Sequence, residues 1–424
     1  MAKLSIKDNT YFVDDKGKPF FYLADTIWSS FTNTTLKEWE QYLDYRAEQG
    51  FNVLQINILR QWDASESDLD LEPFVFKKNG KYDFSRPDEE YFTRAEKMLD
   101  MAVRRNFLPA LVVLWGNYVP GTWLAEADDN KRVMTMSEMK NYVEYVVDRF
   151  ARFNPVYLVS GDTGFQSDKA DEYYLQAMKI IKKKTPEALT TLHIKGSTHN
   201  VSKKLIEADE YDFYMYQSGH TRDYSQGAYK LAEEFTGKSV KRPVLNGEPC
   251  YEGIEPHDKK GEGRFTAIEV RKAIWQSLLS GAGAGVTYGA HGLWSWHKRG
   301  MNFSSSDVFD MPFVWSDALR FRGAEDTARA RWIFQKYNLF GLKPVDDILN
   351  ETEEIRMAET ENCIVIYTPY NTGIKVNRDL SQYDLTVFEL APEKTGKPLI
   401  EINKKESIIQ MGRFNTDRLI IGEK

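Results

Sequence analysis

This sequence is poor in cysteine, lacks long apolar runs and carries no excess of positive charge. Its two cysteines, Cys250 and Cys363, fall in different predicted domains, which excludes a disulfide framework and a cysteine-based zinc site. No stretch of about 18 apolar residues is present, so a membrane-spanning helix is excluded. The net charge of −7 argues against a nucleic-acid partner, because phosphate binding depends on clustered lysine and arginine.

Two further signals are missing near the amino terminus. The segment Met1-Ala-Lys-Leu-Ser-Ile6 has no apolar core, so no signal peptide is visible. We therefore expect a cytoplasmic protein, or a periplasmic or secreted one if a signal peptide has been removed.

The turn Ala24-Asp-Thr-Ile-Trp28 contains no glycine, which argues against the phosphate loop of a doubly wound nucleotide-binding sheet.

Aromatic residues, by contrast, are abundant. They make up 13% of the 424 residues, within an otherwise ordinary globular composition of 42% hydrophobic and 28% charged residues. Large barrels bury many aromatic side chains, and small-molecule sites also use them as walls. The length suits a barrel of roughly 250–350 residues followed by a small appended domain.

A strand followed by a helical pattern recurs eight times from Phe20 onward. Strands are expected at 20–25, 51–59, 107–115, 156–160, 189–194, 211–216, 243–246 and 285–288. The intervening helices are expected to begin at N-caps such as Thr34, Asp88 and Ser137. Eight such units predict an α/β fold, a closed (β/α)8 barrel. A short strand and turn within residues 4–17 is expected to cover the bottom of the barrel.

After Pro344 the pattern changes to short strands separated by turns, for example Cys363–Thr368 and Leu385–Leu390. This spacing is typical of a small antiparallel β domain. We therefore predict a catalytic barrel with an N-terminal β extension over residues 1–345, and a β-sandwich-like accessory domain over residues 346–424.

Two strand ends stand out because each stops at a glycine followed by a carboxylate. They are Tyr157-Leu-Val-Ser-Gly-Asp162 on the fourth predicted strand and Pro243-Val-Leu-Asn-Gly-Glu-Pro249 on the seventh. Barrels of this class act at the C-terminal ends of their strands, so Asp162 and Glu248 are expected to face one mouth. Cleavage of a glycosidic bond needs one protonated and one ionised carboxyl group. These two residues are therefore the predicted catalytic pair.

The other strand ends supply polar and aromatic side chains that suit hydroxyl groups and sugar rings. The predicted substrate-binding residues are Asp25, Trp28, Gln55, Asn57, Trp115, Tyr216, Gln217, His220, His291 and Trp294. Structural alternatives stay open, because Asp25 could cap the first helix and any one tryptophan could serve packing. His193 and His199 match no helical zinc motif, so no metal and no cofactor are predicted.

Several segments, in order along the chain, carry a resemblance to a known family. They are Phe20-Phe-Tyr-Leu-Ala-Asp-Thr-Ile-Trp28, Tyr45-Arg-Ala-Glu-Gln-Gly-Phe-Asn-Val-Leu-Gln55, Ser160-Gly-Asp162, Tyr216-Gln-Ser-Gly-His220, Asn246-Gly-Glu-Pro249 and Thr287-Tyr-Gly-Ala-His-Gly-Leu-Trp-Ser-Trp296. Over residues 18–345 the chain resembles the apiosidase-like glycoside hydrolases, a group that includes glycoside hydrolase family 140. The resemblance implies that Asp162 and Glu248 are catalytic, and analogy with related barrels makes them acid/base and nucleophile, respectively. Those barrels usually carry Asn-Glu on strand four, where this chain has Gly-Asp.

We therefore expect a glycoside hydrolase that removes a terminal sugar from a plant or host polysaccharide by a two-carboxylate, retaining mechanism. The resemblance implies apiose as one candidate sugar, and a galactofuranosidase or glucosidase specificity stays open. A catalytically silent carbohydrate-binding barrel and a metal-dependent barrel hydrolase are the rival interpretations. The predicted partner is a carbohydrate, and the oligomeric state is left open.

Overall fold

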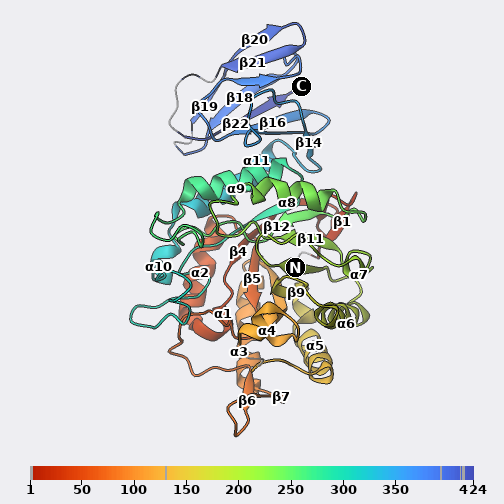
Figure 1. The fold of residues 1–424 in the computed structure, drawn as a ribbon, viewed down its shortest axis with the longest axis vertical. Helices are drawn as coiled ribbons and strands as arrows, with labels where there is room; N and C mark the ends of the chain where they lie inside the picture. The colour runs from red at the N-terminus through yellow and green to blue at the C-terminus, as the bar shows by residue number, and fades with distance from the viewer. Residues whose placement is uncertain (1–2, 129–130, 392–393, 411, 413–415) are drawn as a thin grey trace.

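The computed structural model describes residues 3–128, 131–391, 394–410, 412 and 416–424. Its larger part is a closed barrel of eight parallel strands surrounded by helices, and its smaller part consists of antiparallel sheets (Figure 1). The barrel order is β4–β5–β8–β9–β10–β11–β12–β13, and β13 pairs with β4 to close it. The predicted (β/α)8 barrel with a small C-terminal β domain is confirmed.

The barrel strands are short and buried. They are β4 (Tyr22–Thr26), β5 (Val53–Asn57), β8 (Leu108–Trp115), β9 (Val156–Thr163), β10 (Thr190–Ile194), β11 (Phe213–Tyr216), β12 (Val244–Asn246) and β13 (Gly285–Tyr288). Apolar runs of this kind are covered on one face by the barrel interior and on the other by helices. The polar residues that end the strands are therefore collected at one mouth.

Helices follow the strands around the barrel. The longer ones are α2 (Leu36–Glu48), α3 (Glu89–Val103), α5 (Met136–Phe150), α6 (Asp168–Lys184), α8 (Gly227–Thr236), α9 (Ala267–Leu279) and α11 (Arg322–Lys336). The shorter ones are α1 (Ser30–Asn33), α4 (Trp123–Ala127), α7 (Lys203–Ile206), α10 (Trp315–Ala318) and the 3-10 turns η1 (Gly116–Tyr118) and η2 (Ala151–Phe153). Among the described helices, none is both long and apolar enough to cross a bilayer.

Two of the predicted N-caps are wrong. Helix α2 is capped by Thr35 rather than Thr34, and α5 is capped by Thr135 rather than Ser137. Each capping threonine accepts a hydrogen bond from the amide of a glutamate three residues later, and that glutamate bonds back to the threonine amide. This reciprocal capping box satisfies two helix-end donors at once and decides where the helix starts. Asp88 caps α3 as predicted.

The N-terminal strands lie against the bottom of the barrel. Strands β1 (Ser5–Lys7), β2 (Tyr11–Val13) and β3 (Pro19–Phe20) form an antiparallel sheet. The Phe12 ring contacts those of Tyr22 and Phe213, which begin β4 and β11. The sheet therefore covers the N-terminal end of the barrel, opposite the mouth, as predicted. A hairpin of β6 (Phe74–Phe76) and β7 (Tyr82–Pro87) extends away from the barrel (Figure 1).

The C-terminal part contains two sheets with an apolar cluster between them. The larger sheet orders β14 (Lys343–Val345), β15 (Arg356–Glu359), β16 (Cys363–Thr368), β22 (Arg418–Glu423), β18 (Asp384–Glu389) and β19 (Lys394–Gly396), and the smaller one orders β17 (Ile374–Val376), β21 (Glu406–Gln410) and β20 (Leu399–Asn403). Ile366, Ile374 and Ile409 belong to the shared cluster. Because β14 begins at Lys343, the larger sheet starts three residues before the predicted boundary at residue 346.

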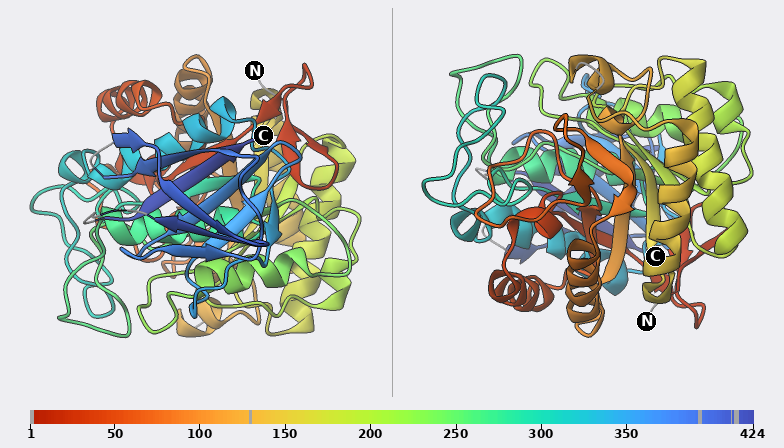
Figure 2. Two further views of the ribbon diagram at one scale, coloured as in Figure 1. Left: turned by 90° about the horizontal axis from the view of Figure 1, so that it is seen from above. Right: turned by 90° about the horizontal axis from the view of Figure 1, so that it is seen from below.

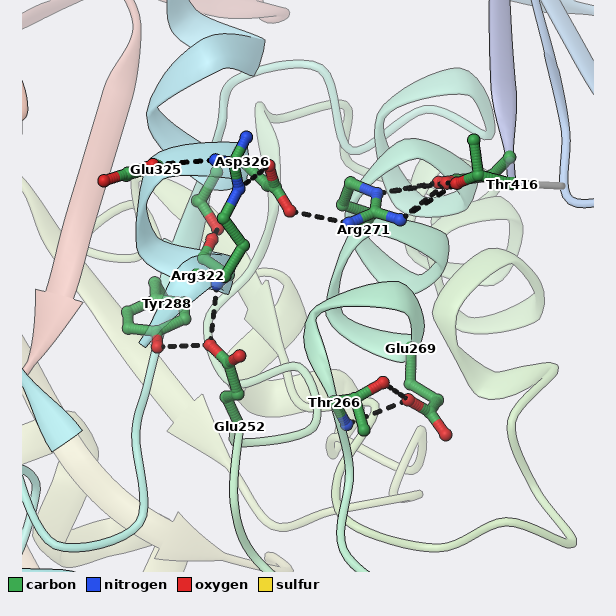
Figure 3. A network of polar contacts seen from close by, with 12 residues as sticks. Glu252, Thr266, Glu269, Arg271, Tyr288, Arg322, Glu325, Asp326 and Thr416 are labelled. Atoms are coloured by element: carbon green, nitrogen blue, oxygen red, sulfur yellow. Dashed lines mark hydrogen bonds and ion pairs between the residues drawn. The ribbon is translucent and has the colours of Figure 1, made fainter. Parts of the chain in front are cut away.

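The C-terminal sheets lie over α9 and α11, on the side of the barrel away from α3 and α5 (Figures 1 and 2). Buried charges join the two parts. Arg271 of α9 lies 2.7 Å from Asp417, which precedes β22, and 2.6 Å from Asp326 of α11. Figure 3 shows that the network continues through the first turn of α11 to Glu252, which lies in the loop after β12. The Glu252 carboxylate accepts hydrogen bonds from the Gly323 amide of α11 and from the Tyr288 hydroxyl. The domain interface therefore contains desolvated ion pairs. Removing one partner of such a pair leaves a buried charge uncompensated and destabilises the fold.

Candidate active site

Asp162 and Glu248 open on the same cavity at the C-terminal mouth of the barrel. Asp162 is the next-to-last residue of β9, and Glu248 lies two residues beyond β12. The cavity has a volume of about 500 Å³ and is lined by residues that end or follow each of the eight barrel strands. Sites for small molecules typically measure roughly 300–1,000 Å³.

A glycine precedes each carboxylate because a side chain would not fit there. A Cβ atom on Gly161 would overlap the indole ring of Trp115, and one on Gly247 would overlap the side chain of Met215. Asp162 itself has a left-handed backbone conformation with φ of 49°. Such a conformation is uncommon outside glycine, although Asp tolerates it better than most residues. The turn that presents Asp162 is therefore set by close packing against Trp115.

Glu248 is surrounded by hydrogen-bond donors. Its Oε1 atom accepts a hydrogen bond from Gln217 Nε2 at 2.8 Å and lies 2.9 Å from His220 Nε2. Its Oε2 atom lies 3.3 Å from His193 Nε2. Burial by itself raises the pKa of Glu248, but the hydrogen bonds from His193 and His220 outweigh burial and lower the pKa to about 2. Glu248 is therefore ionised over the ordinary pH range.

Two backbone amides fix the tautomers of both histidines. The amide of Asp162 donates to His193 Nδ1 at 3.3 Å, and the amide of Tyr251 donates to His220 Nδ1 at 3.2 Å. In a neutral imidazole, the nitrogen that accepts a hydrogen bond leaves the proton on the other nitrogen. Each histidine therefore carries a proton on Nε2, the ring nitrogen that lies 2.9 Å from Glu248 in His220 and 3.3 Å from it in His193.

The Tyr251 hydroxyl provides a further contact to Glu248. It accepts a hydrogen bond from Trp28 Nε1 at 3.0 Å, which leaves its own proton for the carboxylate. Burial, the charge of Glu248 and the hydrogen bond to it hold the pKa of Tyr251 well above its ordinary value. The hydroxyl therefore stays protonated and remains a donor.

Asp162 has the opposite electrostatic environment. Burial and the charge of Glu248 raise its pKa to about 6, although His193 and Lys195 partly offset the rise. Its carboxyl group is therefore protonated in mildly acidic solution. One cavity thus holds carboxyl groups with pKa values of about 6 and about 2, the separation that a general acid and an anion require.

The cavity brings together seven of the twelve predicted site residues: Asp162, Glu248, Trp28, Trp115, Gln217, His220 and Trp294. The indoles of Trp28 and Trp115 meet edge to face with ring centroids 5.2 Å apart. Trp294 stands near Tyr251, with centroids 6.3 Å apart. The catalytic candidates are thus surrounded by aromatic walls.

Asp25 and Tyr216 lie outside the cavity. Asp25 is fully buried, and its Oδ2 atom accepts hydrogen bonds from Arg46 at 2.6 Å and Tyr42 at 2.8 Å. Tyr216 donates to the carbonyl of Ala228 at 2.7 Å. Successive residues of a strand point to opposite faces, and these two point outward to the helices. Neither residue lines the cavity, and Asp25 caps neither α1 nor α2.

Three further predicted residues lie behind the cavity and orient the groups that line it. Gln55 Nε2 donates to a backbone carbonyl of the loop after β12 at 3.2 Å. Asn57 Nδ2 donates to Gln61 Oε1 at 2.8 Å. His291 Nδ1 accepts a hydrogen bond from Trp294 Nε1 at 3.3 Å. Gln55, Asn57 and His291 therefore contact groups next to the cavity, and none of the three lines it.

Several residues at the site were not among the predicted site residues, although Trp62 was one of four tryptophans considered for stacking on the sugar: Trp62, Asp63, Trp123, His193, Lys195, Tyr251 and His257. Asp63, His193 and Lys195 closely follow or end barrel strands, so their position was visible in the sequence. Tyr251 lies farther along a loop, and only the fold brings it to Glu248. Within the described ranges, no group of three His, Cys, Asp or Glu side chains is arranged to hold a metal ion.

A family model described as "Apiosidase-like, catalytic domain" matches residues 6–341. The chain belongs to this apiosidase-like family. The resemblance seen in the sequence is confirmed, and the protein is a glycoside hydrolase by family. No curated protein is significantly similar to the chain.

Solved structures of glycoside hydrolases share the fold. One described as a glycoside hydrolase has a TM-score of 0.82 at 19% identity, covering 100% of this chain and 97% of its own. A glycoside hydrolase family 5 protein from Bacteroides vulgatus has a TM-score of 0.81 at 19% identity, covering 100% and 93%. A family 5 mannosidase from Rhizomucor miehei has a TM-score of 0.53 at 14% identity, covering 79% and 99%. At these identities the similarity shows the fold alone.

Proposed function

We propose that the apiosidase-like protein removes a terminal sugar from a plant or host polysaccharide or oligosaccharide, with Asp162 as acid/base and Glu248 as nucleophile. One observation carries this proposal. In a single cavity Glu248 is kept ionised by histidine donors, whereas burial and the charge of Glu248 raise the pKa of Asp162 to about 6. Paired carboxyl groups in opposite states are what glycoside cleavage requires.

The reaction then proceeds in two steps. Asp162 donates its proton to the leaving glycosidic oxygen while the carboxylate of Glu248 attacks the anomeric carbon and the C–O bond breaks. This forms a glycosyl ester on Glu248. Water then attacks the same carbon, its proton passes to ionised Asp162, and the Glu248 carboxylate is released. The net reaction is glycoside plus water to sugar plus alcohol, with retained configuration.

The shape of the cavity favours a chain end as substrate. Residues that end or follow each of the eight barrel strands line it, from Trp28 after β4 to Trp294 after β13. Walls on every side suit one terminal sugar ring better than the middle of a chain. The candidates for the terminal sugar are apiose, galactofuranose and glucose.

A catalytically silent carbohydrate-binding barrel is the alternative. Pure binding does not require a carboxylate with four surrounding donors beside a protonated carboxyl group. It would require aromatic walls and amide groups, which the cavity also has. Catalysis is therefore favoured by the electrostatics of Glu248 and Asp162, and binding alone would be indicated if both were dispensable.

The test is a hydrolysis screen with matched variants. Purified protein is incubated with pectic and other plant oligosaccharides and with aryl furanosides and pyranosides, mannosides included. Wild type should release one monosaccharide, and Glu248→Gln and Asp162→Asn should each lower kcat by several orders of magnitude. Glu255→Gln, which makes the same chemical change outside the cavity lining, is the control. Undiminished turnover in either active-site variant contradicts the assignment.

Retention has its own test. NMR of the first-formed product should show the configuration of the substrate, and azide should rescue Glu248→Ala as a glycosyl azide of inverted configuration. An inverted first product without azide rescue would show that Glu248 activates water instead.

A further inference from the structure

A third carboxyl group, Asp63, lines the cavity beside the catalytic pair. It lies in the loop after β5, and its side chain is 8% exposed. The charges of Asp162 and Glu248 both act on it, so it is near both. Burial is the largest cause that raises its pKa, to about 7, and the neighbouring carboxylates add to the rise. The proposed two-carboxylate mechanism assigns no role to Asp63.

A relay of buried amides fixes the direction of the Asp63 side chain. Asn57 on β5 donates to Gln61 Oε1 at 2.8 Å, and Gln61 Nε2 donates to Asp63 Oδ1 at 2.7 Å. Asn57 and Gln61 are 1% and 3% exposed, so water does not compete for these hydrogen bonds. The relay occupies one oxygen of Asp63. It leaves Oδ2 without a side-chain partner in the described part of the chain.

No structural role accounts for this placement. Asp63 caps none of the described helices and forms no ion pair with a described lysine, arginine or histidine. Buried carboxyl groups in proteins are normally paired or fully hydrogen-bonded, because desolvation is costly otherwise. A carboxyl group that is held rigidly on one oxygen and faces a cavity with the other is suited to a ligand that brings donors.

We propose that Asp63 binds hydroxyl groups of the sugar that is cleaved, and that the Asn57–Gln61 relay sets its orientation. This inference rests on the proposed glycosidase function and specifies the substrate class. A sugar hydroxyl donates to Oδ2 of Asp63, and a neighbouring hydroxyl can reach the same carboxyl group. The bound sugar thereby supplies the donors that the protein does not.

The same arrangement selects for a neutral sugar. Glu248 is ionised and lines the same small cavity as Asp63, so a carboxylate or sulfate on the bound ring would meet a negative charge, and above about pH 7 a second one on Asp63. Like charges in a desolvated site are repelled strongly. Lys195 also lines the cavity, but its ammonium lies 4.2 Å from the centre of the Trp123 ring. Trp123 in turn donates to the backbone carbonyl of Asp162, which places the lysine on the acid's side of the cavity.

The experiment measures kcat and KM of wild type, Asp63→Asn and Asp63→Ser. The substrates are the aryl glycoside that the screen identifies and its analogue with a carboxylate on the same ring. Asp63→Asn keeps the acceptor for Gln61 but loses the ionisable oxygen. At a pH where Asp63 is protonated it should raise KM and lower kcat/KM about 2- to 10-fold, the value of a hydrogen bond between neutral groups. The loss should be larger above about pH 7, where Asp63 is ionised. Above about pH 7, where Asp63 is ionised, its preference for the neutral sugar over the acidic one should also fall.

Asp171→Asn is the matched control, because Asp171 is a similarly buried aspartate on α6, outside the cavity. It should leave kcat/KM and sugar preference unchanged. The proposal is overturned if Asp63→Asn and Asp63→Ser keep wild-type KM and preference while wild type is active, and the glycosidase assignment then stands. If wild type hydrolyses no glycoside, the glycosidase assignment fails and this inference with it. The proposal is also overturned if both Asp63 variants lose activity only in proportion to a lower unfolding temperature, because Asp63 would then have a structural role.

Discussion

Replacing His220 by phenylalanine should move the acid limb of the pH–activity profile. Phenylalanine keeps a ring next to Tyr251, where the His220 centroid lies 4.4 Å away, but removes the Nε2–H donor 2.9 Å from Glu248. Glu248 acts as an ionised group, so activity is lost as pH falls through its pKa. Removing a donor destabilises the ionised form and raises that pKa.

The size of the shift can be worked from the hydrogen bond. A hydrogen bond to a charged group contributes about 1.5–3 kcal/mol, and one pKa unit corresponds to about 1.36 kcal/mol. The loss of His220 should therefore raise the pKa of Glu248 by about one to two units, from about 2 in the wild type. The acid limb of kcat/KM should then lie between about pH 3 and 4, where it can be followed before the protein unfolds.

The assay is kcat/KM from pH 3 to 8, with stability at each pH checked by circular dichroism. His257→Phe is the control. The His257 ring centroid lies 5.4 Å from that of His220, and His257 is not among the described hydrogen-bond donors to Glu248. Burial lowers the pKa of His257 to about 3, so the control removes no charge above that pH. An acid limb in His220→Phe that matches wild type would refute the account of why Glu248 is ionised.

Three other outcomes are expected. First, the alkaline limb of wild-type kcat/KM should fall near pH 6, because Asp162 must be protonated and its pKa is raised to about 6; a profile flat to pH 8 would remove Asp162 as the acid. Second, Gly161→Ala should lower stability by about 1–3 kcal/mol in urea unfolding and also lower kcat, because its Cβ would overlap Trp115, whereas Gly164→Ala, with no atom closer than 3.4 Å, should do neither. Third, Asp417→Ala should cost about 3–5 kcal/mol of unfolding free energy, because it leaves buried Arg271 with one partner fewer; a loss below about 1 kcal/mol would show that the domain interface does not depend on this pair.

The fold was predictable because the strand–helix alternation is strong and local. Each barrel strand is an apolar run with a helical pattern after it, and the eight-fold count alone specified a closed barrel. Helix starts were predicted less well. Thr34 and Thr35 are both acceptable caps by residue type, and only the spacing to Glu38 distinguishes them. The extent of the C-terminal sheet was also not visible, since β14 is a three-residue edge strand with a central proline.

The position of the candidate site was predictable from the strand ends, because Asp162 and Glu248 were expected at one mouth and both line one cavity. Their catalytic roles stay predictions. The site was not predictable where side-chain direction matters. Asp25 and Trp28 are three residues apart at the end of β4, yet one faces Arg46 behind the strand and the other faces the cavity. Side chains along a strand alternate between its two faces, and this alternation ends where the regular strand ends. The sequence does not show where an irregular strand ends, so it does not show which face a residue near that end occupies.

The protonation states of the site depend on backbone contacts that no sequence pattern records. The amide of Asp162 fixes the tautomer of His193, and the Nε2 atom of His193 lies 3.3 Å from Glu248. The backbone of Asp162 therefore orients a donor next to Glu248, and the two catalytic candidates are coupled through one imidazole as well as by charge. A change confined to the Asp162 side chain leaves this coupling in place. A change at Gly161 that displaces the amide disturbs both residues at once, which is why we expect Gly161→Ala to lower turnover as well as stability.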